Sequence, residues 1–308
     1  KHAKLQKFMD LSTKIVSLHF KLIQNNMLVF TKKSELGVFL EPFIKQKKAI
    51  GFVPTMGALH NGHLSLVNKS ISNNDKTIVS IFVNPTQFNN IEDLKKYPRT
   101  LEQDILKTAT ISKDVVIYAP SVDDIYEKEI VSKNFNFDGI ENQMEGKHRP
   151  GHFDGVGTIV KKLFEIIKPT NAYFGEKDFQ QLQIVKKMVS KNKMNVNIVG
   201  CAILREKSGL AMSSRNERLL KASREKAAFI YKTLKEVKVL FENKSAKEVV
   251  VLVEEKFKKH KDFTFEYFEI CDETNLLPCL RKGKNKKYRA FIAVYIDNIR
   301  LIDNISLK

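Results

Sequence analysis

The segment from Thr55 to His63 holds the side chains with the clearest chemical potential. It reads TMGALHNGH and lies between an apolar stretch typical of a buried strand and a stretch with helical spacing. His60 and His63 are three positions apart and so share one side of the first helical turn. Backbone N–H groups at a helix start attract phosphate, and Gly57 and Gly62 let the backbone approach closely. We predict that this turn binds a polyphosphate and stabilises the charge that develops when pyrophosphate leaves.

Two other interpretations of these histidines are weaker. Either imidazole alone would more simply be a buried, hydrogen-bonded side chain, and only the pair with its two glycines favours a functional role. A zinc site is not favoured, because the segment has no Glu in an H-E-x-x-H arrangement. No metal site built by the protein is predicted.

Polar side chains also follow the strands predicted at 77–83 and 171–174. Gln87 can offer a donor and an acceptor to a hydroxyl or carboxylate, although an ordinary polar loop would look the same. Lys177 is a candidate point charge for phosphate, and Asp178 could cap a helix or hold Mg²⁺ or a ribose. Gln181 lies one turn further on and could face the same cleft, although a capped helix with surface charges fits this segment equally well.

Two further segments leave structural and functional interpretations open. The hydroxyls of Ser213 and Ser214 and the guanidinium of Arg215 suit phosphate oxygens, but a helix start with a capping Ser explains them equally well. The polar connection at 146–153 is either a substrate-facing loop or a solvated linker.

The elements that must position these residues form an alternating pattern. Near-continuous apolar strands alternate with helices up to about residue 203, which predicts a doubly wound α/β domain with a parallel, Rossmann-like sheet. In such a fold ligands bind at the carboxyl ends of the strands, where most of these motifs fall. The predicted strands are a short one after Leu28, then 49–53, 77–83, 114–118, 171–174 and 195–201.

The chain beyond residue 204 predicts a smaller α+β domain that could act as a lid. One long helix is expected at 221–243 and a second at 246–260, followed by alternating strands at 263–271 and 288–296 and a short one near 300–302. Within the larger domain, Thr100 and Gln103 occupy capping-box positions before a helix.

Composition limits the class of protein. The 308 residues are 43% hydrophobic and 29% charged, typical of a globular protein, and no apolar run reaches the length of a membrane span. Three cysteines without a C-x-x-C pair favour buried thiols and a reducing cytoplasm over a disulfide framework. The net charge of +18 raises RNA binding as an alternative, but the lysines are spread along the chain, so no nucleic-acid partner is predicted.

Residues 1–26 stand apart from the rest of the sequence. They hold five lysines, no arginine and a modest amphipathic pattern, so a transit peptide is conceivable. We favour a protein start at Met27, with an extension of uncertain status before it.

Taken together, the motifs resemble those of the pantothenate synthetase (pantoate–β-alanine ligase) family, within the HxGH nucleotidyl-transferase superfamily. The H-x-G-H turn is shared across that superfamily, whereas FGEKDFQQ together with MSSRN is far more specific. The likeness covers residues 27–308, and its motifs are PTMGALHNGH at 54–63, NPTQF at 84–88, YPRT at 97–100, RPGHFDGV at 149–156, FGEKDFQQL at 174–182 and GLAMSSRN at 209–216.

The resemblance implies a two-step reaction in which ATP and pantoate give pantoyl adenylate and pyrophosphate, and β-alanine then displaces AMP to give pantothenate. It also implies Mg²⁺ with ATP, a homodimer and a cytoplasmic location. His63 would be the catalytic acid, with His60 and Lys177 holding phosphate. Gln87 and Gln181 would bind pantoate, with Gln87 also near β-alanine. The ATP site would comprise Met56, Gly57, Ala58, Leu59, His60, Asn61, Gly62, His63, Gly175, Glu176, Lys177, Asp178, Leu204, Met212, Ser213, Ser214 and Arg215.

One position departs from the family pattern. Asn61 stands where the family often has an acidic residue. We expect the change to be tolerated, because the backbone and the two histidines carry the site. Another adenylyltransferase of the superfamily, acting on a phosphorylated acceptor, remains the alternative function, although two neutral glutamines suit a hydroxy acid better than a phosphate.

Overall fold

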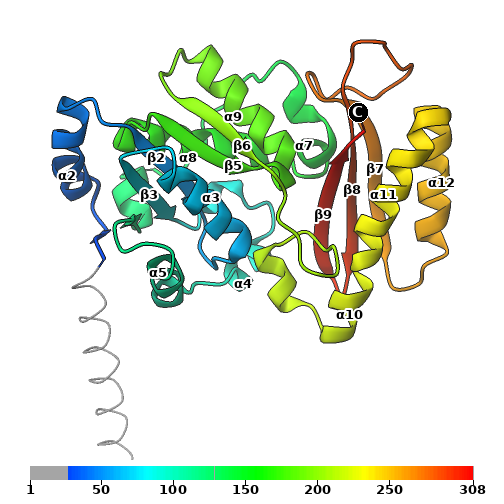
Figure 1. The fold of residues 1–308 in the computed structure, drawn as a ribbon, viewed down its shortest axis with the longest axis horizontal. Coiled ribbons are helices and arrows are strands. Elements are labelled where there is room, and N and C mark those ends of the chain that lie inside the picture. The colour runs from blue at the N-terminus through cyan, green and yellow to red at the C-terminus, as the bar shows by residue number, and fades with distance from the viewer. Residues whose placement is uncertain (1–26, 128, 308) are drawn as a thin grey trace, which may run out of the picture.

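The computed structural model describes residues 27–127 and 129–307, which form two β-sheets with their helices (Figure 1). The larger sheet has six parallel strands in the order β1-β4-β3-β2-β5-β6, and the smaller has three antiparallel strands in the order β7-β8-β9. The predicted fold class is confirmed. The expectations for residues 1–26 lie outside the described part of the chain.

The strands of the larger sheet fall where the apolar runs predicted them. Strand β2 is central and pairs with β3 on one side and β5 on the other, so the chain reverses direction across the sheet between β2 and β5. The carboxyl ends of these two strands therefore form the topological switch point where ligands bind in folds of this type. The strands are β1 Val29–Phe30, β2 Ile50–Thr55, β3 Lys76–Ile81, β4 Val116–Tyr118, β5 Asn171–Gly175 and β6 Asn197–Cys201.

Helices cover both faces of this sheet, as the buried strands require. Helices α2 (Lys33–Lys45), α8 (His152–Ile167) and α9 (Phe179–Lys191) share the larger hydrophobic core with one face. Helices α3 (Asn61–Ile71) and α5 (Leu101–Ala109) pack on the other. Three shorter helices, which the sequence analysis did not predict, are α4 Ile91–Lys96, α6 Val122–Tyr126 and α7 Met144–His148.

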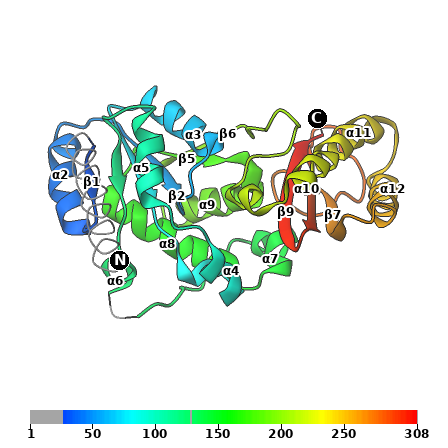
Figure 2. The same cartoon turned by 90° about the horizontal axis from the view of Figure 1, so that it is seen from below.

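The smaller sheet is built from β7 (Thr264–Asp272), β8 (Tyr288–Ile296) and β9 (Ile299–Ser306). Alternate residues of β8 face opposite sides, as the period of a strand requires. Ala290, Ile292 and Val294 pack against α11 (Ala228–Asn243) and α12 (Ala246–Lys258). Phe291 and Ala293 instead join the core of the larger part. The two parts therefore share one core, and they lie side by side (Figure 2). The domain boundary between residues 203 and 204 stays a prediction.

Three local predictions were wrong. The long helix expected at 221–243 is divided into α10 (Lys221–Lys226) and α11, because a turn at the buried Ala227 interrupts it. The last strand spans eight residues instead of the short stretch near 300–302. Thr100 forms no capping box, because its hydroxyl donates a hydrogen bond to Asp104 Oδ2 at 3.2 Å.

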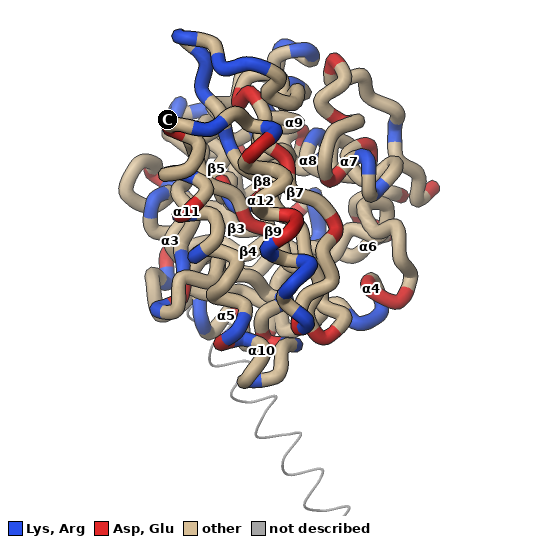
Figure 3. The backbone as a smooth tube through the Cα atoms, turned by 90° about the vertical axis from the view of Figure 1, so that its right-hand side faces the viewer, with Lys and Arg blue, Asp and Glu red and all other residues tan. Residues whose placement is uncertain are grey.

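The charged residues and cysteines fit the compositional expectations. Lys and Arg are interspersed with Asp and Glu over the molecule (Figure 3). Cys201, Cys271 and Cys279 are free and buried. Within the described part of the chain, no helix has the length and apolar character needed to cross a membrane.

Candidate active site

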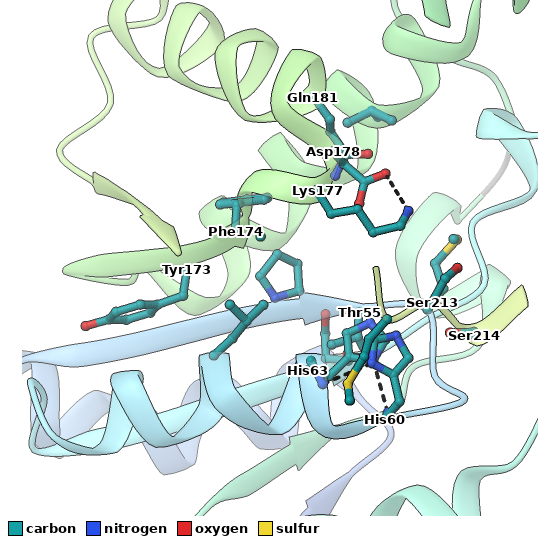
Figure 4. Close-up of a pocket in the computed structure, with 18 of the residues that line it drawn as sticks. Thr55, His60, His63, Tyr173, Phe174, Lys177, Asp178, Gln181, Ser213 and Ser214 are labelled. Carbon is teal, nitrogen blue, oxygen red and sulfur yellow. Dashed lines mark hydrogen bonds and ion pairs between the residues drawn. The ribbon is translucent and has the colours of Figure 1, made fainter. Parts of the chain in front are cut away.

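A cavity of about 220 Å³ lies at the carboxyl ends of β2, β3 and β5. It brings together side chains that are far apart in the sequence, and Figure 4 shows His60 and His63 on one side with Lys177 and Asp178 on the other. The residues of the predicted site that line it are Met56, His60, Gly62, His63, Gln87, Gly175, Lys177, Asp178, Gln181, Leu204, Met212, Ser213, Ser214 and Arg215.

Five predicted residues do not line this cavity. Gly57, Ala58 and Leu59 form the turn behind it, and Leu59 is buried in the core. Asn61 is exposed at the start of α3. Glu176 turns toward the smaller sheet, where its carboxylate lies 3.5 Å from Arg289 Nη2.

Each histidine ring accepts a hydrogen bond from a backbone N–H group at the start of α3. His60 Nδ1 accepts a hydrogen bond from the Gly62 N–H at 3.1 Å, and His63 Nδ1 accepts one from the His60 N–H at 3.3 Å. Their ring centroids lie 4.0 Å apart. Since an accepting nitrogen carries no proton, each neutral imidazole must carry its proton on Nε2. The site thus holds two imidazole N–H donors on one helical turn.

Both imidazoles are neutral at pH 7 in this structure. Burial, helped by the charges of Lys177 and Lys107, lowers the pKa of His60 to about 4. Burial also lowers the pKa of His63 well below its usual value, with His60 and Lys177 as further causes. Cationic neighbours and loss of water both disfavour the charged ring. An anionic polyphosphate in the cavity would oppose this effect and raise both pKa values.

The turn that precedes the histidines depends on Asp104, which the sequence analysis did not identify. Gly57 and Ala58 adopt φ values of 83° and 48°, in the left-handed region. The fully buried Asp104 accepts hydrogen bonds from Ala58 N–H at 2.9 Å and Leu59 N–H at 2.7 Å. Lys107, one turn further along α5, donates to the Leu59 carbonyl at 2.7 Å. Helix α5 therefore fixes the backbone of this turn.

The segment after β5 supplies the opposing wall. Residues Glu176–Asp178 form a short 3-10 helix that leads into α9, and Lys177 Nζ lies 3.8 Å from Asp178 Oδ1. The Asp178 side chain caps no backbone N–H group of α9, so the capping role considered for it is wrong. Gln181 lies on the first turn of α9 and lines the same cavity, as predicted.

Ser214 and Arg215 begin a short 3-10 helix at Ser214–Arg218, and Ser213 comes directly before it. Ser213 caps it by accepting the Arg215 N–H at 3.3 Å, which confirms the capping interpretation for that hydroxyl. Ser214 Oγ donates to the Ala58 carbonyl at 3.1 Å, so this segment contacts the histidine turn directly. The Arg215 guanidinium is paired with Asp93 of α4 at 2.7 Å.

Metal-binding groups are sparse around the cavity. In residues 27–127 and 129–307, no three His, Cys, Asp or Glu side chains gather as a metal site would require. Asp178 is the carboxylate on the cavity wall. Mg²⁺ is usually held by one or two carboxylates together with substrate phosphates and water, so this donor set fits a metal that arrives with a nucleotide.

Comparisons with known proteins agree on one family. The model of the pantoate-beta-alanine ligase family matches residues 27–306. The chain is 65% identical over 282 residues to a pantothenate synthetase of Flavobacterium psychrophilum, covering 92% of this chain and all of the relative. A crystal structure of pantothenate synthetase from Thermus thermophilus superposes with a TM-score of 0.84 at 36% identity, covering 91% of this chain and 99% of that one.

A second solved structure carries ligands. It is a pantoate-beta-alanine ligase from Francisella tularensis complexed with beta-gamma ATP and beta-alanine, with a TM-score of 0.76 at 40% identity over 91% of this chain and 97% of that one. The match to the family model over nearly all the described residues, together with these relatives, places the protein: the chain belongs to the pantoate-beta-alanine ligase family.

Proposed function

We propose that this enzyme condenses (R)-pantoate with β-alanine at the expense of ATP, through a pantoyl-adenylate intermediate, and releases pyrophosphate and AMP. One observation carries the proposal: His60, His63, Lys177, Gln87 and Gln181 line a single cavity at the switch point of the sheet. The Francisella tularensis structure, complexed with beta-gamma ATP and beta-alanine, supports the choice of two of the three substrates. Membership of the family decides against an RNA-binding protein or an adenylyltransferase with a phosphorylated acceptor.

In the first step the pantoate carboxylate attacks the α-phosphorus of ATP and pyrophosphate leaves. The Nε2–H groups of His60 and His63 and the ammonium of Lys177 would stabilise the negative charge that grows on the leaving phosphates. His63 is the proposed acid, and its Nε2 proton is the one shared with the leaving group. His60 would hold phosphate. No protein nucleophile is needed, because the substrate carboxylate is itself the nucleophile.

In the second step the free amine of β-alanine attacks the acyl carbon of the adenylate, and AMP leaves with the electrons of the broken C–O bond. The nitrogen gives up one proton to water as the amide forms. Gln87 and Gln181 would hold the pantoyl group through their side-chain amides, with Gln87 also near β-alanine. Enclosure of the adenylate between these residues would protect it from water.

The nucleotide would lie along the turn before α3 and the segments opposite it. The proposed contacts are the backbone and side chains of Met56 to His63, Gly175 to Asp178, Leu204 and Met212 to Arg215. Gly57, Ala58 and Leu59 would contribute through the shape of the turn that Asp104 holds.

Three further properties are proposed by resemblance to the family. Mg²⁺ would accompany ATP, with Asp178 as the protein carboxylate closest at hand and the phosphates as its main ligands. The enzyme would act as a homodimer. Its setting would be the cytoplasm, in keeping with three free, buried cysteines.

The proposal is tested by following pyrophosphate and AMP separately. Purified enzyme with ATP should release pyrophosphate only when pantoate is present, and β-alanine should be required for release of AMP. Pyrophosphate release that does not depend on pantoate, or no turnover with all three substrates, would contradict the assigned reaction.

A further inference from the structure

We infer that Tyr126 is a positioning residue for the acyl substrate: its hydroxyl, acting through Asn84, fixes the side-chain amide of Gln87 with the NH₂ group toward the cavity. Tyr126 ends the short helix α6, is buried, and does not line the cavity itself. The inference rests on the proposed function, because the orientation of Gln87 matters only if the cavity binds the hydroxy acid.

The chain of hydrogen bonds starts at the tyrosine. The Tyr126 hydroxyl donates to Asn84 Oδ1 at 2.5 Å. The Thr86 hydroxyl lies 3.2 Å from the same oxygen and 3.0 Å from the Tyr126 hydroxyl. Asn84 is 1% exposed, so these bonds are not exchanged with water. Burial raises the pKa of Tyr126, and its hydroxyl therefore remains a donor at any working pH.

A backbone group at the other end of the Asn84 amide selects the same orientation. Asn84 Nδ2 donates to the Gly155 carbonyl at 3.2 Å, and a carbonyl oxygen can only accept. The second proton of Nδ2 goes to Gln87 Oε1 at 3.1 Å. The oxygen of Asn84 must then face the two hydroxyls. Because the oxygen of Gln87 is occupied, its NH₂ group is the free end, and it lies 2.9 Å from Met56 Sδ on the cavity wall.

The backbone of Gln87 is held separately, by helix α8 and the residues before it. His152 Nδ1 donates to the Gln87 carbonyl at 2.8 Å, and Arg149 Nη2 adds a second bond at 3.3 Å. A Cβ atom at Gly155 would lie 2.3 Å from the Thr86 carbonyl oxygen, so the helix backbone itself touches this segment. Only the side-chain torsions of Gln87 remain free, and Asn84 and Tyr126 restrict these.

The consequence is a preference for one kind of substrate group. A thioether is a weak acceptor, so the Gln87 NH₂ group can exchange Met56 for an oxygen of the substrate. It would donate to a hydroxyl or carboxylate oxygen of the acyl substrate and would offer nothing to a donor-only group. Without the Tyr126 hydroxyl, Asn84 keeps only Thr86 at Oδ1 and Gly155 at Nδ2. The Asn84 amide, and with it the Gln87 amide, is then held less tightly.

The test is Tyr126→Phe, with Tyr118→Phe as the matched control. Tyr118 is also fully buried, and its hydroxyl donates to Asp124 Oδ2 at 3.0 Å, but it lies outside the cavity and outside this hydrogen-bond chain. We expect Tyr126→Phe to raise the KM for pantoate by about 5- to 10-fold, since one buried hydrogen bond is lost, and to leave the KM for ATP within about twofold. Tyr118→Phe should leave both values within about twofold.

A pantoate KM unchanged in Tyr126→Phe, or raised equally for ATP, would overturn the inference. If Tyr126→Phe does not fold, Thr86→Val replaces it: removal of the second hydroxyl should raise the pantoate KM alone, and no change would overturn the inference. Absence of pantoate-dependent turnover in the unmodified enzyme would instead overturn the proposed function, so the two failures are distinguishable.

Discussion

The two histidines of the site present their Nε2–H groups as neutral donors, because backbone N–H groups at the start of α3 occupy both Nδ1 atoms. His60 and His63 are therefore oriented before any ligand arrives, and donors fixed in advance need no reorganisation during the reaction. Burial lowers the pKa of His63 well below its usual value, so its ring is a neutral donor.

Replacement of His63 tests that role. We expect His63→Ala to lower the rate of pantoate-dependent pyrophosphate release by ~10²-fold or more, because a donor to the leaving group is lost. The melting temperature and circular dichroism spectrum should stay close to those of the unmodified enzyme. His260→Ala, in the smaller part of the chain, is the control and should retain the rate. A rate near that of the unmodified enzyme would remove His63 from the mechanism.

His152 gives a prediction on stability and pH. Burial lowers the pKa of His152 to about 3, with the charge of Arg149 as the next cause. In the unfolded chain its pKa is about 6.5, so the unfolded state binds more protons below that value. The neutral His152 ring therefore costs the fold nothing above pH 6.5. Below that value the free energy of unfolding falls with pH, down to the folded-state pKa of about 3. Between pH 7 and pH 5 this one group should remove about 2 kcal/mol from the free energy of unfolding.

Urea titrations of the enzyme and of His152→Gln at both pH values measure this contribution. The unmodified enzyme should lose more stability on acidification than the variant, because Gln does not titrate. Equal losses in the two proteins would contradict the assignment of a depressed pKa to His152.

The sequence could identify residues that lie close together in a motif. His60 and His63 could be paired because one helical turn joins them. The roles of Asp104 and Asn84 could not be predicted, because their contacts with distant segments form only in the fold. Asp104 binds the turn before α3, and Asn84 binds Tyr126 and Gly155. A polar side chain on a predicted helix is most simply assigned to solvent, and only the packing of α5 under the turn shows that Asp104 is buried.

At the level of elements, α5 supports the turn that carries the histidines. We expect Asp104→Asn to destabilise the enzyme by about 2 kcal/mol and to raise the KM for ATP several-fold. The Asp104 carboxylate accepts one hydrogen bond on each oxygen, from the Ala58 and Leu59 N–H groups. A side-chain amide has only one oxygen, so one of these N–H groups would lose its acceptor. Burial raises the pKa of Asp104, although its backbone and Thr100 hydrogen bonds oppose this.

Thermal melting and ATP saturation curves measure both effects. The control is Asp114→Asn, at an exposed aspartate before β4, which should change neither quantity. An Asp104→Asn enzyme with normal stability and a normal KM would show that the turn holds its shape without this carboxylate.

Strand positions could be predicted because buried strands are continuous apolar runs. Short helices such as α4 and α6 could not be predicted, since six or five residues carry too little periodicity. Capping could not be predicted reliably either. Thr100 and Gln103 match the capping-box pattern, but the Thr100 hydroxyl donates to Asp104 instead.

For the whole molecule, the arrangement of the two parts depends on a buried charge cluster. Arg300 of β9 donates to both oxygens of Glu145 in α7 at 2.7 Å each, and Tyr267 of β7 donates to the same carboxylate. Burial alone would raise the pKa of Glu145, but the hydrogen bonds and charge of Arg300 outweigh it and lower the pKa to about 2. These contacts join residues 122 and 155 positions apart, so no local pattern could have revealed them.

Removal of this carboxylate should weaken the contact between the two parts. We expect Glu145→Ala to cost about 3 kcal/mol of stability, because it leaves buried positive charge with fewer partners. Glu236→Ala, which breaks the pair with Lys256 on α11 and α12, should change stability by no more than about 0.5 kcal/mol. Urea unfolding compares the two variants, and equal midpoints would contradict a special role for Glu145.

The most direct test of the central claim is detection of the intermediate. Enzyme in excess over ATP should be mixed with pantoate without β-alanine, quenched within one turnover, and analysed by mass spectrometry. We predict one pantoyl adenylate for each pyrophosphate released, and its conversion to pantothenate and AMP when β-alanine is added before the quench. Pyrophosphate without a pantoyl adenylate, or ADP and phosphate as products, would contradict the account.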